Sequence, residues 1–411
     1  MTKHTAVTRL GCLVLAGLWT AAAAAGTGTT APDYYRRARH AQTAEKQLEL
    51  LSAALAINPD HIPSLRRRAD LHVLLGDERA ALPFRTRAAN LAPHDVPLNI
   101  SAGLLAQNLG EYERASAFYD RALAVQPANV QARSNRAQIR LRLGQVREAA
   151  MDAEELVRIA PERDGSYLIR LETHQAAGRF AEAAADATTL IDRSLDRPEL
   201  YLRRSFLYQA LGKGRDALAD AEEVVRLRGP CPHAHANRGC CYQMLGELEK
   251  AFEGYQRAAC LGGYRAYYHI WMALVRRRQG RPDEAGEIAS QALENLDGDE
   301  WPAPVLRYLT GALTEDDLLR QAEHSNPRRQ RERQCEVYYY LGAAALADDD
   351  LDRAEDLFNR CIGLEVHNFY EHAFALRDLR MIEERRKEEG QEEEQEEEQE
   401  AEDGDRGPEP E

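Results

Sequence analysis

A cluster of cysteines and histidines is the part of this chain whose residue types most readily suggest chemistry. Thiolate and imidazole groups are preferred ligands of zinc. Zinc sites, however, usually draw their ligands from tight pairs of the C-x2-C type, and that spacing is absent here. The two histidines also point to different faces of a helix. We therefore predict no metal and no cofactor from this cluster, which comprises Cys231, His233, His235, Cys240, Cys241 and Cys260.

Disulfides are a second interpretation of the cysteines. Cys231 precedes the first helix of an expected helical hairpin, and Cys260 lies near the end of the second, where antiparallel helices bring their ends together. Cys335 and Cys361 occupy similar places in a later hairpin. We predict the pairs Cys231–Cys260 and Cys335–Cys361 for an exported chain. Reduced core thiols are the alternative, because small cysteines are common in protein interiors.

Other combinations of reactive residues lack catalytic spacing. His367, Glu371 and His372 form an H-x3-E-H pattern, whereas metallopeptidase helices carry H-E-x2-H or H-x2-E-H. The acidic turn 348–350 lacks the glycine and distal glutamate of a calcium-binding loop. The sequence contains no nucleophile elbow, phosphate loop or dinucleotide fingerprint. We predict that the chain is not an enzyme. A catalytic site within residues 298–334 is the alternative of another class.

The elements that position these residues follow a repeat of 34 residues. A glycine recurs at this interval seven times, and an alanine follows each glycine five residues later. Glycine suits the end of a helix because it accepts a positive φ, and alanine allows two helices to approach closely. The repeating residues are Gly76, Gly110, Gly144, Gly178, Gly212, Gly246 and Gly280, with Ala81, Ala115, Ala149, Ala183, Ala217, Ala251 and Ala285.

This pattern resembles the tetratricopeptide repeat (TPR) family, whose helix–turn–helix units have a period of 34 residues. The resemblance implies an all-α superhelical solenoid of about eight repeats. It places seven repeats over residues 62–297 and a final repeat with a capping helix over 335–384, where Asp349 replaces the usual glycine. Residues 26–61 are expected to form capping helices, and 298–334 an irregular helical spacer. The fullest single match is Leu109, Gly110, Tyr112, Ala115, Tyr119, Ala122 and Pro127.

The TPR resemblance also implies where a partner would bind. The concave face of such a solenoid is lined mainly by the first helix of each repeat, and its side chains become apolar in the later repeats. An exposed apolar stripe of this kind is typical of a groove for a protein or peptide partner. In a tight superhelix the same side chains would instead be buried against the next repeat. The predicted partner-binding residues are Leu168, Leu202, Phe206, Tyr267, Ile270 and Leu274.

The two ends of the chain differ from the repeats in composition. Residues 1–25 combine a basic start, an apolar run and an Ala-x-Ala site, as in a secretory signal peptide. Residues 388–411 carry 14 acidic residues and one arginine, and therefore −13 of the formal net charge of −15. The remaining residues are nearly neutral and lack nucleic-acid-binding motifs, so no nucleic-acid partner is expected. We predict an exported, soluble chain without a stable membrane span and with a disordered acidic tail over 385–411.

A narrower resemblance covers about 75 residues near the C-terminus. They look like the C-terminal part of NlpI-type bacterial lipoproteins, which implies an envelope adaptor for peptidoglycan hydrolases and a protease. The chain lacks their lipobox and has more repeats, so neither the anchor nor the partner follows. We predict an exported scaffold, with a component of secretion or outer-membrane assembly machinery as the alternative. The matching residues include Trp301-Pro302, Tyr308-Leu309-Thr310-Gly311, Tyr339-Tyr340-Leu341-Gly342 and Val366-His367-Asn368-Phe369-Tyr370-Glu371-His372.

Overall fold

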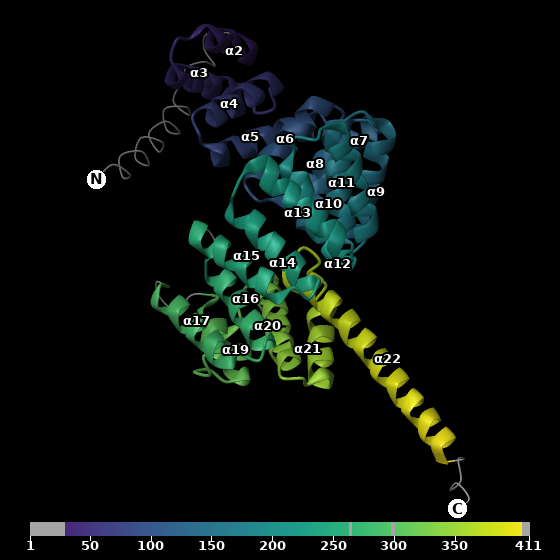
Figure 1. Cartoon of the computed structure of the whole chain (residues 1–411). Helices are drawn as coiled ribbons and strands as arrows, with labels where there is room; N and C mark the ends of the chain where they lie inside the picture. The colour runs from purple at the N-terminus through teal and green to yellow at the C-terminus, as the bar shows by residue number, and fades with distance from the viewer. Residues whose placement is uncertain (1–28, 263–264, 297–300, 405–411) are drawn as a thin grey trace, which may run out of the picture. The chain divides into compact units, whose positions relative to one another are not determined.

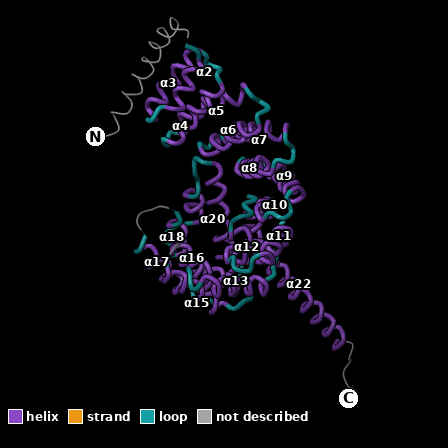
Figure 2. Tube along the Cα trace, turned by 90° about the horizontal axis from the view of Figure 1, so that it is seen from above, coloured by secondary structure: helices purple, strands orange, loops and turns teal. Residues whose placement is uncertain are grey.

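The structure, a computed structural model, describes residues 29–262, 265–296 and 301–404. Within these ranges the chain forms helices joined by loops, without strands (Figures 1 and 2). The predicted all-α fold is confirmed. The predicted signal peptide over residues 1–25 lies outside the described ranges. The chain divides into two compact units, with the boundary between Ile169 and Arg170 inside one helix.

The first unit consists of helices that contact one another in sequence-adjacent pairs. The pairs α2–α3, α4–α5, α6–α7 and α8–α9 are hairpins, and α3, α5 and α7 also contact the helix that follows them. Each hairpin therefore stacks on the next one in the chain, as expected for a repeat protein. The bounds are α2 (Ala31–His40), α3 (Ala44–Ile57), α4 (Ile62–Leu74), α5 (Glu78–Leu91), α6 (Val96–Asn108), α7 (Tyr112–Val125), α8 (Val130–Arg142), α9 (Val146–Ile159) and α10 (Asp164–Ala176), whose end belongs to the second unit.

The second unit continues the hairpins and adds a C-terminal group of helices. The pairs α12–α13, α14–α15, α16–α17 and α20–α21 are in contact, and α22 contacts α12, α20 and α21. The start of α22 thus returns to helices much earlier in the chain. The bounds are α11 (Phe180–Arg193), α12 (Pro198–Ala210), α13 (Gly214–Arg228), α14 (Pro232–Met244), α15 (Leu248–Leu261), α16 (Arg265–Arg278), α17 (Pro282–Glu294), α18 (Ala303–Leu309), α19 (Glu315–Gln321), α20 (Pro327–Ala347), α21 (Leu351–Gly363) and α22 (Tyr370–Gly404).

The repeated glycines form the turn within each hairpin. Gly110 follows α6 with φ +79°, and its amide donates to the Gln107 carbonyl at 3.0 Å. The next amide, of Glu111, donates to the Ala106 carbonyl at 2.9 Å. This left-handed helix ending favours glycine, because a Cβ atom would strain it. All seven repeat glycines have φ between +70° and +79°, and the seven alanines are at most 3% exposed between their helices.

The structure specifies the segments that flank the regular repeats. Within residues 26–61, where capping helices were expected, α2 and α3 form a complete hairpin over residues 31–57. The basic stretch 326–334, assigned to the irregular spacer, instead opens the long helix α20. Asn326 caps this helix by accepting from the amides of Arg328 and Arg329, and Pro327 occupies its first position, where proline is favoured.

The acidic tail also differs from the prediction. Residues 385–404 were expected to be disordered, whereas α22 continues to Gly404 and extends away from the rest of the second unit in both views (Figures 1 and 2). Glutamate, glutamine, arginine and lysine are strong helix formers even where nothing packs against them. The guanidinium of Arg385 also donates to Glu389, one turn later, at 2.8 Å. The expected disorder over 385–404 is therefore corrected to helix.

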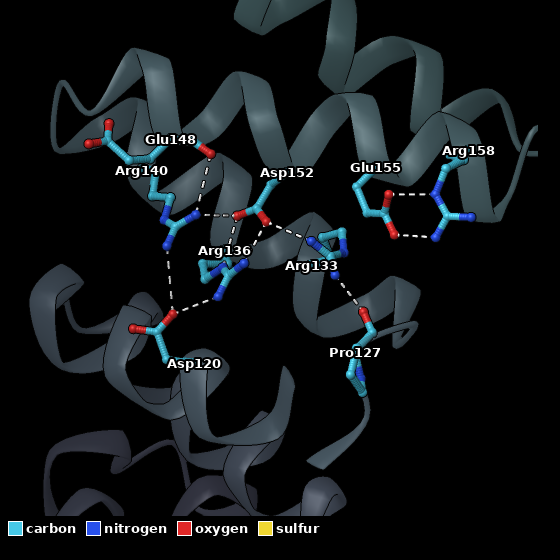
Figure 3. Close-up of polar contacts among 9 residues, drawn as sticks. All are labelled: Asp120, Pro127, Arg133, Arg136, Arg140, Glu148, Asp152, Glu155 and Arg158. Atoms are coloured by element: carbon cyan, nitrogen blue, oxygen red, sulfur yellow. Dashed lines mark hydrogen bonds and ion pairs between the residues drawn. The ribbon is translucent and has the colours of Figure 1, made fainter. Parts of the chain in front are cut away.

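A buried ion cluster joins the two helices of one repeat in the first unit (Figure 3). Asp152 of α9 accepts hydrogen bonds from Arg133 at 3.0 Å, Arg136 at 2.8 Å and Arg140 at 2.7 Å, all on α8. The carboxylate side chain is only 2% exposed. Asp120 of the preceding repeat also accepts from Arg136, at 2.7 Å. One buried carboxylate thus fixes how α8 packs on α9.

The same repeat positions carry ion pairs in the second unit. Arg170 donates to Asp186 at 3.0 Å, and Arg204 donates to Asp220 at 2.8 Å. Arg170 and Arg204 follow Arg136 at intervals of 34 residues, and Asp186 and Asp220 follow Asp152 at the same interval. Both residue types recur at this interval in the sequence, so the pairs could have been predicted from it. They form a structural ladder between paired helices and not a separate site.

Candidate functional site

The second unit contains a cavity of about 370 Å³ where α14, α16 and α20 meet the start of α22. Aromatic side chains supply much of its wall. Tyr267, Tyr268 and Trp271 come from successive turns of α16. Tyr370 is the first residue of α22, and Phe369 directly precedes it. The spacing of three and four residues on α16 places Tyr268 and Tyr267 beside Trp271 on one face. The result is a mostly apolar hollow with a small number of polar groups.

Glu336 of α20 is one of these polar groups, and it is 6% exposed. Its Oε2 accepts hydrogen bonds from the Trp301 indole at 2.7 Å and from the Tyr267 hydroxyl at 3.2 Å. Burial, followed by the charge of nearby Glu371, raises the pKa of Glu336 to about 8, whereas the two hydrogen bonds act in the opposite direction. Burial therefore favours the protonated form of the Glu336 carboxyl.

Glu371 of α22 is the second carboxyl group of the cavity, and it is 5% exposed. It accepts a hydrogen bond from the Tyr340 hydroxyl at 2.7 Å. Burial raises its pKa, against the effect of that hydrogen bond. Within the described residues, no lysine or arginine forms an ion pair with either glutamate. Two buried acids thus share one cavity without a compensating cation.

Cys240 of α14 also lines the cavity, next to the hydroxyl of Tyr255 at 3.4 Å. It is 1% exposed, and burial raises the pKa of its thiol to about 12. The thiolate is the nucleophilic form of cysteine, so this thiol is unreactive near neutral pH. Burial of the thiol therefore disfavours nucleophilic chemistry at Cys240.

The six predicted partner-binding residues fall into two groups. Leu202 and Tyr267 are half-buried in the second unit, and Leu168 is half-buried at the end of the first. Of the six, only Tyr267 lines the cavity. The other three are buried by the protein itself: Phe206 is 5% exposed, Ile270 0% and Leu274 4%. The expectation that all six line an open groove is corrected for these three. A partner-binding role for Leu168, Leu202 and Tyr267 stays a prediction.

The C-terminal segment of the same chain covers part of the expected groove. The Tyr370 ring lies edge-on to Phe206, with ring centroids 5.0 Å apart, and 6.2 Å from Trp271. Further along α22, Arg380 donates to the carbonyl of Ala210 at 3.0 Å. Apolar side chains predicted to hold a partner thus hold the capping helix. The sequence could not separate these alternatives, because both require the same apolar stripe.

His367 and His372, which belong to the metallopeptidase-like pattern, contact each other. Nδ1 of His367 lies 3.1 Å from Nε2 of His372, and both rings pack near Phe180. Burial lowers the pKa of both, that of His372 to about 4. Over the described part of the chain, no group of three His, Cys, Asp or Glu residues is arranged to hold a metal ion.

The predicted disulfides are not formed in the structure, where all four cysteines are free thiols. Cys231 is half-buried at the start of α14, and Cys260 is exposed. Cys335 and Cys361 are buried and lie close together, with their sulfur atoms 3.4 Å apart. That separation is a nonbonded contact, since a disulfide bond is about 2.05 Å long.

Sequence reasoning missed Glu336 and did not recognise Glu371 as its neighbour. Glu336 stands inside a run of buried residues that includes Cys335, Val337 and Tyr339. An acid within an apolar stretch is a usable signal, because an unpaired buried carboxyl is costly and functional sites often contain such groups. Of residues 298–334, proposed as a place for a hidden active site, Trp301 reaches the cavity through its bond to Glu336.

The comparison with protein families agrees with the repeated helical hairpins of the fold. The tetratricopeptide repeat family matches residues 100–164 and 207–267. These parts of the chain are tetratricopeptide repeats. TPR arrays act as scaffolds for protein–protein interaction, presenting extended concave surfaces to their partners. No helix of this TPR protein is long and apolar enough to cross a bilayer, as far as the described residues extend.

Solved TPR structures show related helical repeats. A TPR protein from Parabacteroides merdae is 20% identical, with 64% of this chain and 98% of that chain covered and a TM-score of 0.40. YrrB, described as a TPR protein with an unusual peptide-binding site, is 20% identical. The match covers 43% of this chain and 91% of YrrB, with a TM-score of 0.39. TTC0263 from Thermus thermophilus is 22% identical. The match covers 44% of this chain and 98% of TTC0263, with a TM-score of 0.34. At these identities the likeness concerns the fold alone.

Proposed function

We propose that this TPR protein is a non-catalytic scaffold that holds a segment of a partner protein at the cavity of the second unit. The observation that carries the proposal is the cavity itself, which combines aromatic walls with a few convergent polar groups. Such a hollow is the usual form of a binding site. Tyr and Trp side chains supply large contact areas, and they are enriched among residues that dominate binding energy.

In this proposal Tyr267 contacts the partner, because it lines the cavity and remains half-buried. Ile270 and Leu274 have an indirect role in this proposal: they are buried on the same helix and anchor it in the protein core. Leu202 would extend the contact surface within the second unit, and Leu168 would contribute a separate contact from the first unit. The C-terminal segment completes the cavity wall through Phe369 and Tyr370.

Affinity capture with two variants tests the assignment. Tyr267→Arg places a charged side chain at the cavity, and we expect it to remove the partner captured by the wild-type chain. Tyr242→Arg is the matched control, because Tyr242 is also half-buried in the second unit but does not line the cavity. Both variants should keep the wild-type helical circular dichroism. The same partner recovered with Tyr267→Arg would refute binding at this place.

We further propose that the scaffold acts outside the cytoplasm as a cell-envelope adaptor. The proposal rests on the signal-like composition of residues 1–25 and on the NlpI-like residues near the C-terminus. Mass spectrometry of the chain from the extracytoplasmic fraction should find Gly26 as its first residue. Recovery only from the cytoplasm, with residues 1–25 intact, would contradict export.

A further inference from the structure

The cavity differs from an ordinary apolar groove because it holds two buried acids without a cation. Glu336 and Glu371 are each less than one-tenth exposed, and neither forms an ion pair within the described residues. Burying a carboxyl group is costly unless it is paired or stays neutral. Arg333, whose guanidinium carbon lies 5.2 Å from the Trp301 ring centre, packs on that ring and forms no ion pair with Glu336.

Hydrogen-bond partners occupy only part of the acceptor capacity. Both hydrogen bonds to Glu336 arrive at Oε2, and no donor from the described residues reaches Oε1. A carboxylate oxygen that no protein donor reaches, in the wall of a cavity, can accept hydrogen bonds from a bound ligand. The ligand must supply donors for Glu336 and tolerate aromatic walls.

A cationic side chain meets both requirements. Aromatic faces attract cations, and a guanidinium can stack on a ring while its N–H groups bond a carboxylate. The available space is sufficient, because about 370 Å³ exceeds the roughly 30 Å³ share of one liquid water about tenfold. A guanidinium would also neutralise the negative charge of the ionised carboxyl groups, which burial otherwise disfavours.

We propose that the cavity selects an arginine side chain of the partner polypeptide, held between Trp271 and the carboxyl groups of Glu336 and Glu371. This inference rests on the proposed function and adds the chemistry of the ligand to it. Binding converts a neutral carboxyl into a carboxylate and releases its proton to solvent. The affinity for arginine therefore rises with pH as Glu336 ionises more readily.

Tryptophan fluorescence provides a direct assay. In a Trp19→Phe chain the remaining tryptophans are Trp271 and Trp301, one lining the cavity and the other bonded to Glu336. The probes are acetyl-Ala-Arg-Ala-amide and the same peptide with citrulline, which is neutral and nearly isosteric. We expect the arginine peptide to bind at least about tenfold more tightly, as one charge-assisted contact provides. The preference should increase between about pH 6 and pH 8.5.

Glu336→Gln should reduce the preference for arginine to less than about threefold while keeping an acceptor for Trp301 and Tyr267. Glu371→Gln is the second variant, in case the first alters folding by circular dichroism. The control Glu323→Gln removes an exposed acid from the loop between α19 and α20 and should leave the preference unchanged. Equal binding of both peptides, or no saturable response to either, would overturn the inference.

Free agmatine separates a polypeptide side chain from a small metabolite. Tighter binding of agmatine than of the arginine peptide would overturn the assignment to a polypeptide. The proposed function has an independent readout, because capture of the partner and its loss in Tyr267→Arg do not depend on arginine. If that pattern is observed without any arginine preference, the scaffold function stands and only this inference fails.

Discussion

Glu336→Gln should increase the stability of the second unit, and the increase should grow with pH. The pKa of Glu336 is about 8 in the folded protein and 4.5 in its ordinary state. An acid whose pKa is raised by folding contributes its full stability below pH 4.5 and loses it as the pH rises through 8. Glutamine cannot ionise, so the variant escapes this loss.

The magnitude follows from the two pKa values. At 1.36 kcal/mol per pKa unit, the difference corresponds to roughly 5 kcal/mol, which is an upper limit for the gain at pH 9 relative to pH 4.5. The groups that face Glu336 are Glu371 of α22, Tyr267 of α16, the Trp301 indole before α18, and Glu332 of its own helix.

Urea unfolding followed by Trp271 and Trp301 fluorescence measures this change in the second unit. The free energy of unfolding should be compared between variant and wild type from about pH 5 to pH 9. The difference cancels the titration of groups common to both chains. Glu323→Gln, at an exposed position, should show no such trend. A difference between Glu336→Gln and wild type that stays constant with pH would refute the reasoning about this carboxyl.

Three further substitutions test the packing of the repeats. Tyr370→Ala removes the ring that contacts Phe206 at 5.0 Å, and it should cost about 3 kcal/mol in urea unfolding and accelerate hydrogen exchange in α22. Asp152→Asn deprives three arginines of their buried partner and should cost about 3–5 kcal/mol, whereas Asp120→Asn, at a side chain 51% exposed, should cost less than about 1 kcal/mol; equal costs would contradict the cluster's importance. Gly110→Ala should cost about 1–2 kcal/mol in urea unfolding because of its φ of +79°. Gly286→Ala, in helix α17 with open space around it, should be neutral or stabilising in the same assay.

The repeats could be predicted from the sequence because their determinants are local. Gly110 and Ala115 lie in one hairpin, and the turn and the close helix contact need only residues near them. The same reasoning identified Asp349, whose φ of +65° matches the repeat glycines. Composition alone misjudged residues 385–404, because the absence of apolar side chains removes packing but not helix propensity.

The cavity could not be predicted because it depends on contacts between distant segments. Glu336 and Glu371 come together only when the start of α22 packs against α12 and α20. The ring centroids of Phe206 and Tyr370 are 5.0 Å apart, but these residues belong to α12 and α22, which are far apart in the sequence. An apolar stripe shows that something covers a helix face, and it does not show whether a partner or the chain itself does so.

Site-specific photo-crosslinking tests the central claim most directly. A photoreactive amino acid replaces Tyr267 at the cavity or, as the control, Tyr242 elsewhere in the second unit, and the full chain is expressed in the cell that normally produces it. The proposed scaffold function predicts one defined protein adduct from position 267 that is absent from position 242. No adduct from position 267, or identical adducts from both positions, would contradict partner binding at this cavity.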